Sequence, residues 1–217
     1  MELCPVPFLV TFSLLAGAPD LAQVRGGDPT PREALQDELL RVGEEDQQYR
    51  AELQDNLIKM SNAGAPAPSE EVLALQKKQD EIDKRNLARL EEIVKQHGWP
   101  GRGLVGEEAS MAAFLILQHA DLTSQKKYFP LLKKAAAEGD ARLADAAMLE
   151  DRILMREGKK QIYGTQVRSG PETGRKLELY PIEDELHVEE RRAAVGLPPL
   201  ADYLKLFGLE YKLKSKE

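Results

Sequence analysis

The chain has 217 residues, of which 42% are hydrophobic, so it is long enough for one domain with a substantial core. Its formal net charge is −7, and no lysine- and arginine-rich stripe alternates with aromatic residues, which argues against nucleic-acid binding. The only cysteine, Cys4, excludes an internal disulfide and a cysteine-based zinc site.

The first 18 residues have the composition of a signal peptide, with an apolar core that ends in the small residues Ala16-Gly17-Ala18. This core is too short to form a stable membrane span, which takes roughly 20 residues. Glu2 stands where a signal peptide usually has a basic residue, so an unstructured start is the alternative. Cleavage would make the protein exported, periplasmic or extracellular; otherwise we expect it to be cytoplasmic.

Two long helices are predicted after a Gly- and Pro-rich linker at residues 19–31. The first runs from Pro31 to about Met60, with Thr30 as its N-cap and an apolar heptad seam along one face. The second runs from Ser69 to about Gln96 and ends at Gly98. Antiparallel packing of the two would give an αα-hairpin.

A central helix is predicted over about residues 106–120, because that stretch is apolar on nearly every side. The next helix is expected to run from Pro130 to Glu138. Pro130 should separate it from a first helical turn just before it. Asp140 is then expected to cap a helix over about residues 141–157.

Alternating β-branched and aromatic residues at 160–167 and 175–182 flank a turn-rich connection and predict a short β-hairpin. Two more helices are expected, at 183–197 and 198–209. The predicted fold is therefore mainly α: a helical bundle with a long N-terminal αα-hairpin and a short β-hairpin near the C-terminal part. Residues 32–207 would form the single domain and 208–217 a charged tail.

Four of the predicted helices place polar residues on faces that should be buried, which indicates a shared polar pocket between facing helices. Isolated buried carboxylates are costly, so their recurrence on several helices favours a common site. The alternatives are a structural Asp46–Arg50 ion pair, solvent-facing positions on a long helix, and a hydrogen-bonded core histidine. The residues in question are Asp46, Asp83, Asn86, Gln118, His119 and Asp151.

No motif fixes a reaction. There is no GxSxG motif of serine hydrolases and no phosphate-binding glycine loop. A divalent metal held by His119 with Asp46, Asp83 and Asp151 has suitable ligand types, but HExxH or ExxH spacing is missing, so no metal ligand and no cofactor is predicted.

The stretch QIYGTQ, residues 161–166, gathers two amides, a phenol and a hydroxyl around Gly164. Glycine in a strand permits a bulge or a close backbone approach to a ligand. The alternative is a hairpin edge with ordinary cross-strand pairs.

Long ordered motifs resemble an uncharacterised, mainly bacterial domain family with a GWP…QHAD…YGTQ…RRAxVGL signature. The motifs are DQQYR (46–50), GWPGRGLVG (98–106), LILQHAD (115–121), DRILMREGKKQIYGTQ (151–166) and the stretch at 181–204. The family has no established activity, so the resemblance implies a domain boundary and characteristic residues only. Glu185 departs from the family, which more often has proline there. The characteristic residues are Asp46, Gln47, Arg50, Trp99, Gln118, His119, Asp151, Gln161, Tyr163, Gly164, Thr165, Gln166, Asp184 and Arg192.

Two functions are consistent with these patterns. The first is a pocket that binds a small polar ligand and hydrolyses it or transfers a group, with His119 as general acid or base beside Asp151 or Asp46. The second is a non-catalytic interaction module, immunity-like or regulatory, that docks a protein partner through a partly exposed seam at Leu35, Leu39, Leu53 and Met60. In the first hypothesis the ligand-binding residues are Gln47, Arg50, Asp83, Asn86, Trp99, Gln118, Gln161, Tyr163, Thr165, Gln166 and Arg192.

Overall fold

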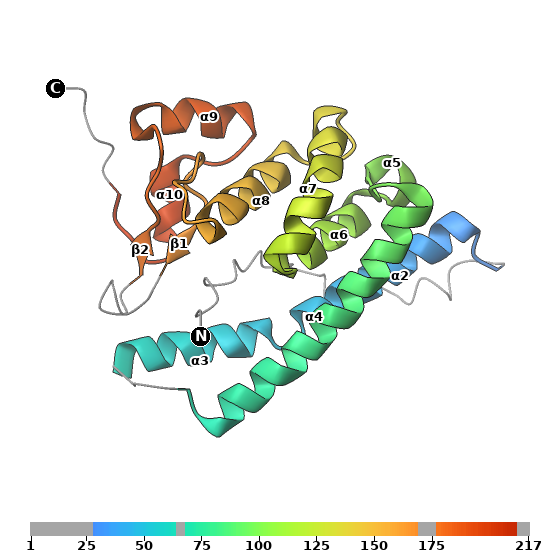
Figure 1. The fold of residues 1–217 in the computed structure, drawn as a ribbon, viewed down its shortest axis with the longest axis horizontal. Helices are drawn as coiled ribbons and strands as arrows, with labels where there is room; N and C mark the ends of the chain where they lie inside the picture. Colours follow the sequence, from blue (N-terminus) through green and yellow to red (C-terminus); the bar gives the residue numbers. More distant parts are fainter. Residues whose placement is uncertain (1–27, 64–67, 169–176, 212–217) are drawn as a thin grey trace.

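The computed structural model describes residues 28–63, 68–168 and 177–211. The predicted signal segment and most of the predicted linker lie outside these residues. The fold is mainly α, as predicted, with one short antiparallel β-hairpin (Figure 1). No helix among the described residues is both long and apolar enough to cross a bilayer.

Two helices, α2 (Pro31–Gln47) and α3 (Arg50–Ala63), replace the single helix predicted over 31–60. The predicted start is confirmed: Thr30 and Glu33 cap each other reciprocally, as in a capping box. The prediction of a continuous helix was wrong because the side chain of Gln79 takes over two backbone groups at the break. Its Oε1 accepts from the Tyr49 N–H at 3.2 Å, and its Nε2 donates to the Asp46 carbonyl at 2.9 Å.

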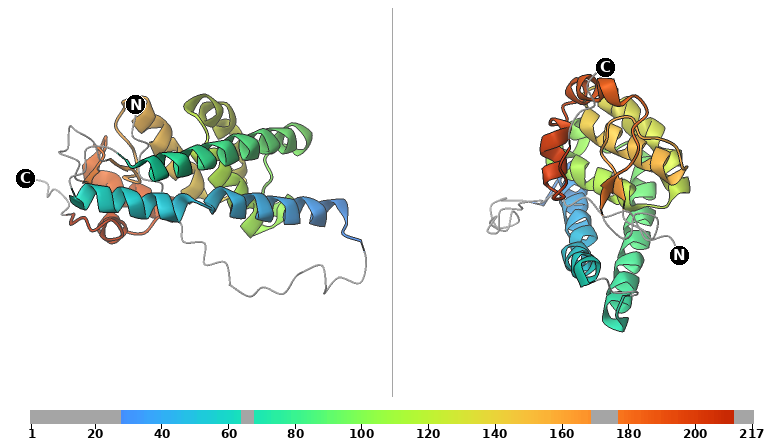
Figure 2. Two further views of the ribbon diagram at one scale, coloured as in Figure 1. Left: turned by 90° about the horizontal axis from the view of Figure 1, so that it is seen from below. Right: turned by 90° about the vertical axis from the view of Figure 1, so that its left-hand side faces the viewer.

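The long helix α4 (Glu70–His97) runs beside α2 and α3, which confirms the predicted hairpin (Figure 2). Ser69 caps its start, and Gly98, with φ of 76°, ends it. After Gly98 the chain turns into a short helix, α5 (Arg102–Val105), that the sequence did not predict. Both ends of α4 were predictable because local residues set them.

The central helix α6 (Glu107–His119) packs against α2, α4, α7 and α8. It approaches α2 closely at Gly43, where a Cβ added to the glycine would lie 2.6 Å from the Cβ of Ala112. Phe114, Leu115 and Leu117 are among its core residues, at 2% exposure or less. The predicted central position of this helix is confirmed.

The pair α7 (Leu122–Ala137) and α8 (Leu143–Arg156) covers α6 on the side away from α2. Two predictions fail here. Pro130 lies inside α7 at an exposed position and does not interrupt it. The N-cap of α8 is Arg142 instead of Asp140, because the Asp140 carboxylate accepts from the Gly103 N–H at 2.5 Å and ties α5 to the start of α8.

The C-terminal elements gather at the end of α8 (Figure 1). They have a small apolar core of their own, built on Val167, Val188, Leu200, Tyr203 and Leu204. The predicted strands shrink to two residues each, joined antiparallel with Val167 opposite Leu179, with an isolated bridge between Gln161 and Ile182. Between these pairings, side chains take the backbone N–H groups: Asp151 accepts from Thr165, and Gln161 accepts from Gln166. The elements are β1 (Val167–Arg168), β2 (Glu178–Leu179), the 3-10 turn η2 (Glu185–His187), α9 (Val188–Ala194) and α10 (Leu200–Lys205).

Candidate functional site

A buried carboxylate–imidazole pair lies where the end of α2 meets the end of α6. The Oδ2 atom of Asp46 is 2.8 Å from Nδ1 of His119. The side chains are 1% and 4% exposed, so water contributes little to the solvation of either. The residues are 73 positions apart in the sequence, and the close packing of α2 on α6 brings them together.

Two further side chains, those of Arg50 and Gln47, hold the Asp46 carboxylate in place. Arg50, one turn later, donates to both carboxylate oxygens at 3.2 and 3.1 Å and also binds Asp83 of α4 at 2.6 Å. The Nε2 atom of Gln47 donates to Asp46 Oδ2 at 2.7 Å. This arrangement confirms the contact between Asp46 and Arg50 and brings Asp83 into the same cluster. We call Asp46, Arg50, Asp83 and His119 the polar cluster.

The charges in the polar cluster fix the state of the histidine. Burial opposes ionisation of Asp46, but hydrogen bonding to His119 and the charge of Arg50 hold its pKa well below the ordinary value. Burial lowers the pKa of His119 to about 4, against the opposing effect of Asp46. At neutral pH the imidazole is therefore neutral, and because an ionised carboxylate only accepts, its proton must sit on Nδ1.

The other ring nitrogen, Nε2 of His119, is consequently an unprotonated acceptor. It is covered by protein atoms and has no hydrogen-bond partner in the described part of the chain. Buried polar atoms normally have a partner, so this nitrogen is a candidate acceptor for a hydrogen bond from a ligand or a buried water.

The carboxylate of Asp151, predicted as a possible partner of His119, instead binds the loop that follows α8. Its oxygens accept from the backbone N–H groups of Ile162, Tyr163 and Thr165 at 2.6 to 3.2 Å, and from the Thr165 hydroxyl at 2.9 Å. Burial raises its pKa, and these hydrogen bonds counteract that effect. Of the two carboxylates proposed to orient His119, Asp46 is therefore the one in contact with it.

The loop 161–166 is fastened from its other side by Arg192, which is 0% exposed. Its guanidinium donates to the carbonyls of Tyr163 and Pro198, both at 2.7 Å, and lies over the Tyr203 ring at 4.9 Å. Within the loop, Gln161 and Gln166 bond backbone groups of the protein itself. These polar groups, and the Thr165 hydroxyl, hold the loop together, so their hydrogen bonds are structural, although they are not the cross-strand pairs of a hairpin edge.

The remaining predicted residues lie apart from the polar cluster or beside it. Asn86 bonds the Val42 carbonyl at 3.1 Å and fastens α4 to α2. Trp99 is buried, and its Nε1 lacks a partner among the described residues. Gln118 is buried next to His119 in sequence, and its Nε2 is likewise without a described partner. Tyr163 is only half-buried, in the Asp151 loop.

Two residues that sequence reasoning did not select belong to this region. Gln79 joins the helix break to Asp83 at 2.7 Å. Its position on the inner face of α4, one turn before Asp83, was the available signal. Arg152 is 2% exposed, and its charge helps to lower the pKa of His119. No group of three or more His, Cys, Asp or Glu side chains is arranged to hold a metal ion within the described ranges.

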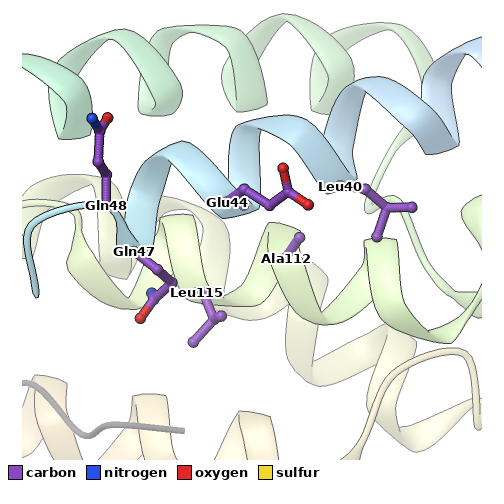
Figure 3. A pocket seen from close by; sticks show the side chains of 7 residues that line it. Leu40, Glu44, Gln47, Gln48, Ala112 and Leu115 are labelled. Carbon is purple, nitrogen blue, oxygen red and sulfur yellow. The ribbon is translucent and has the colours of Figure 1, made fainter. Parts of the chain in front are cut away.

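A hollow of about 180 Å³ adjoins the polar cluster along the seam between α2 and α6 (Figure 3). Gln47 connects the two, since it lines the hollow and donates to Asp46. Leu115 precedes His119 by about one turn of α6, so the two side chains lie on the same face of that helix. The lining residues are Leu40, Gly43, Glu44, Gln47, Gln48, Ala112 and Leu115.

Comparison with protein families matches residues 33–216 to a family of unknown function (DUF6624). The matched range includes every residue of the polar cluster and of the Asp151 loop. No curated protein matches the chain, and no solved structure matches it either.

Proposed function

The chain belongs to the DUF6624 family of unknown function, and we propose that it binds a small polar ligand at the polar cluster, with His119 as the proton acceptor. The observation that carries this proposal is the free lone pair of His119 Nε2. Asp46 holds the opposite ring nitrogen at 2.8 Å, and Nε2 has no partner among the described residues. A ligand with an O–H or N–H group would complete that hydrogen bond.

The arrangement suits general-base chemistry. A buried aspartate that accepts from one ring nitrogen fixes the tautomer and stabilises the imidazolium that forms when the other nitrogen takes a proton. In that step the proton moves from a hydroxyl, an amine or water to His119 Nε2, and the electron pair stays on the ligand oxygen or nitrogen. Hydrolysis and group transfer both begin with such a step, and the polar cluster favours neither.

Access to the acceptor requires movement of side chains, because Nε2 is covered by protein atoms. The solvent-facing part of the polar cluster is Asp83, whose side chain is 21% exposed, beside Arg50 at 9%. Burial raises the pKa of Asp83, and the charge of Arg50 opposes that shift. A ligand that approaches from this side would meet a carboxylate and a guanidinium before it reaches the imidazole.

The alternative of a protein-interaction module depends on an exposed helical seam. Leu35, Leu39 and Leu53 are 9%, 1% and 6% exposed, so these three face the interior. The side chain of Met60 lies outside the described residues. Because these three leucines are buried, they offer no surface on which a protein partner could dock. The polar cluster is therefore the better-supported site.

A ligand screen with a matched pair of variants tests the proposal. A ligand present at 100 times its dissociation constant adds about 2.7 kcal/mol to stability, which is visible as a thermal shift. His119→Asn keeps a donor toward Asp46 but removes the Nε2 acceptor, so it should abolish that shift. His97→Asn, at the exposed end of α4, is the control and should leave the shift unchanged.

Equal ligand shifts in the two variants would overturn the assignment of His119. So would a screen of polar metabolites that gives no shift with the unmodified protein. Cooperative unfolding of both variants without ligand establishes that a lost shift reflects lost binding.

A further inference from the structure

The hollow between α2 and α6 combines an apolar wall with a rim of hydrogen-bond acceptors. Leu40, Ala112 and Leu115 supply the wall. Glu44 and Gln47 stand on the rim, and the Glu44 carboxylate extends toward Leu40 (Figure 3). The hollow meets the polar cluster only through Gln47, so it can be considered separately from His119.

The orientation of the Gln47 amide is set by its neighbour. Its Nε2 donates to Asp46 Oδ2 at 2.7 Å, and the low pKa of Asp46 keeps that carboxylate an acceptor. The amide therefore cannot be reversed without placing two acceptors against each other. Its Oε1 is left as an acceptor, with no hydrogen bond in the described part of the chain.

Glu44 adds a negative charge without a counter-ion. It is exposed and forms no ion pair among the described residues. The next residue differs, since Glu45 is paired with Arg41 at 2.9 Å and with Arg85 at 2.7 Å. The rim of the hollow thus presents a free carboxylate and a free amide oxygen, while the amide nitrogen of Gln47 is directed to Asp46.

We propose that this hollow binds a small primary amine. The ammonium group would donate to the Glu44 carboxylate, while the alkyl or aryl group would pack on Leu40, Ala112 and Leu115, and Gln47 Oε1 would add a further acceptor to the lining. Charge complementarity selects the cation: an ammonium group has donors only, and the rim offers acceptors.

The size of the hollow limits the apolar group. A cavity of roughly 150 Å³ in another protein holds a benzene molecule. The hollow here, at about 180 Å³, accordingly accepts a group of similar size. Hexylamine and benzylamine are suitable probes, and hexanol and hexanoate match hexylamine in length with neutral and negative head groups.

Calorimetric titration at neutral pH with these four probes tests the proposal. Both amines should bind, hexanol should bind more weakly than hexylamine, and hexanoate should not bind. Glu44→Gln should weaken hexylamine binding by about fivefold, the upper range for a solvent-exposed ion pair. Glu81→Gln removes a charge from an exposed position on α4 and should leave the affinity unchanged.

A second variant tests the location by shape. Leu40 is only partly buried, so Leu40→Trp should fill the hollow while the helical circular dichroism stays unchanged, and hexylamine binding should be lost. The proposal is overturned if hexylamine does not bind, if hexanol binds as tightly, if the two glutamate variants behave alike, or if Leu40→Trp has no effect. None of these variants alters His119, so the result is independent of the function proposed above.

Discussion

Asp46 and Asp151 are both 0% exposed, yet their surroundings differ. Asp151 is surrounded by backbone donors from one loop, together with the hydroxyl of Thr165. Asp46 is surrounded by side chains from three helices, among them an imidazole. The groups that donate to Asp151 have their hydrogen atoms directed at that carboxylate. Among the groups around Asp46, His119 has a second ring nitrogen, which has no partner among the described residues.

We interpret the difference as that between a structural carboxylate and the carboxylate of the proposed binding site. A carboxylate that fixes a backbone loop stabilises one conformation and leaves no reactive atom. A carboxylate that accepts a hydrogen bond from an imidazole fixes the proton on one ring nitrogen, so the other ring nitrogen is an acceptor. The three predictions below test this distinction through stability, through the tautomer of His119 and through pH.

The largest effect is expected for Asp151→Ala. Its loss leaves three backbone N–H groups and a hydroxyl buried without an acceptor, so the free energy of unfolding should fall by about 4 kcal/mol. Urea denaturation measures that loss, and hydrogen exchange should show faster exchange at 162–165. Asp55→Ala, at an exposed carboxylate of α3, is the control. A loss below about 1 kcal/mol would mean that the loop does not depend on Asp151.

A smaller loss of about 3 kcal/mol is expected for Asp46→Asn, because Arg50 keeps a carboxylate partner in Asp83. The more telling measurement is the nitrogen-15 spectrum of His119. In the unmodified protein the proton should sit on Nδ1, and the variant should lose that preference. Asp80→Asn, on the exposed face of α4, should change neither quantity. An unchanged tautomer would contradict the role given to Asp46.

The smallest effect is the pH dependence of stability. The pKa of His119 is about 4 in the folded chain and about 6.5 when unfolded. Since the unfolded state takes up the proton first, stability should fall as the pH drops from about 6.5 to 4, by up to about 3 kcal/mol. Asp151 acts in the opposite direction in the acid range, because its pKa is raised.

Unfolding measurements across this pH range check the sign. His119→Asn should flatten the fall between pH 6.5 and 4, whereas His97→Asn should not. A proton signal of His119 that titrates near pH 6.5 in the folded protein would refute the neutral, buried state described for it.

Features set by nearby residues were predictable. Ser69 and Gly98 delimit α4 by local capping, and the one-turn spacing of Asp46 and Arg50 indicated their contact. Features set by distant residues were not. The break after Gln47 depends on the side chain of Gln79, 30 positions beyond Tyr49, and no local signal at the break reveals it.

The sequence predicted which residues belong to the candidate site better than it predicted which of them form hydrogen bonds with one another. His119 and Asp46 were selected because both interrupt apolar faces, and the structure places them in contact. Asp151 was selected for the same reason, but its partners lie in a loop whose conformation the sequence pattern does not specify. Periodicity shows that a side chain points inward; it does not show which neighbouring element supplies its hydrogen bonds.

Gly43 lies one turn before Asp46, and Ala112 lies two turns before His119. A methyl group at position 43 would come within 2.6 Å of the Ala112 side chain, so the helices could not remain at their present separation. The 2.8 Å contact between carboxylate and imidazole thus depends on the absence of a Cβ atom at position 43. Any residue with a Cβ at that position would act on the histidine as a spacer, altering its hydrogen bond without touching either partner.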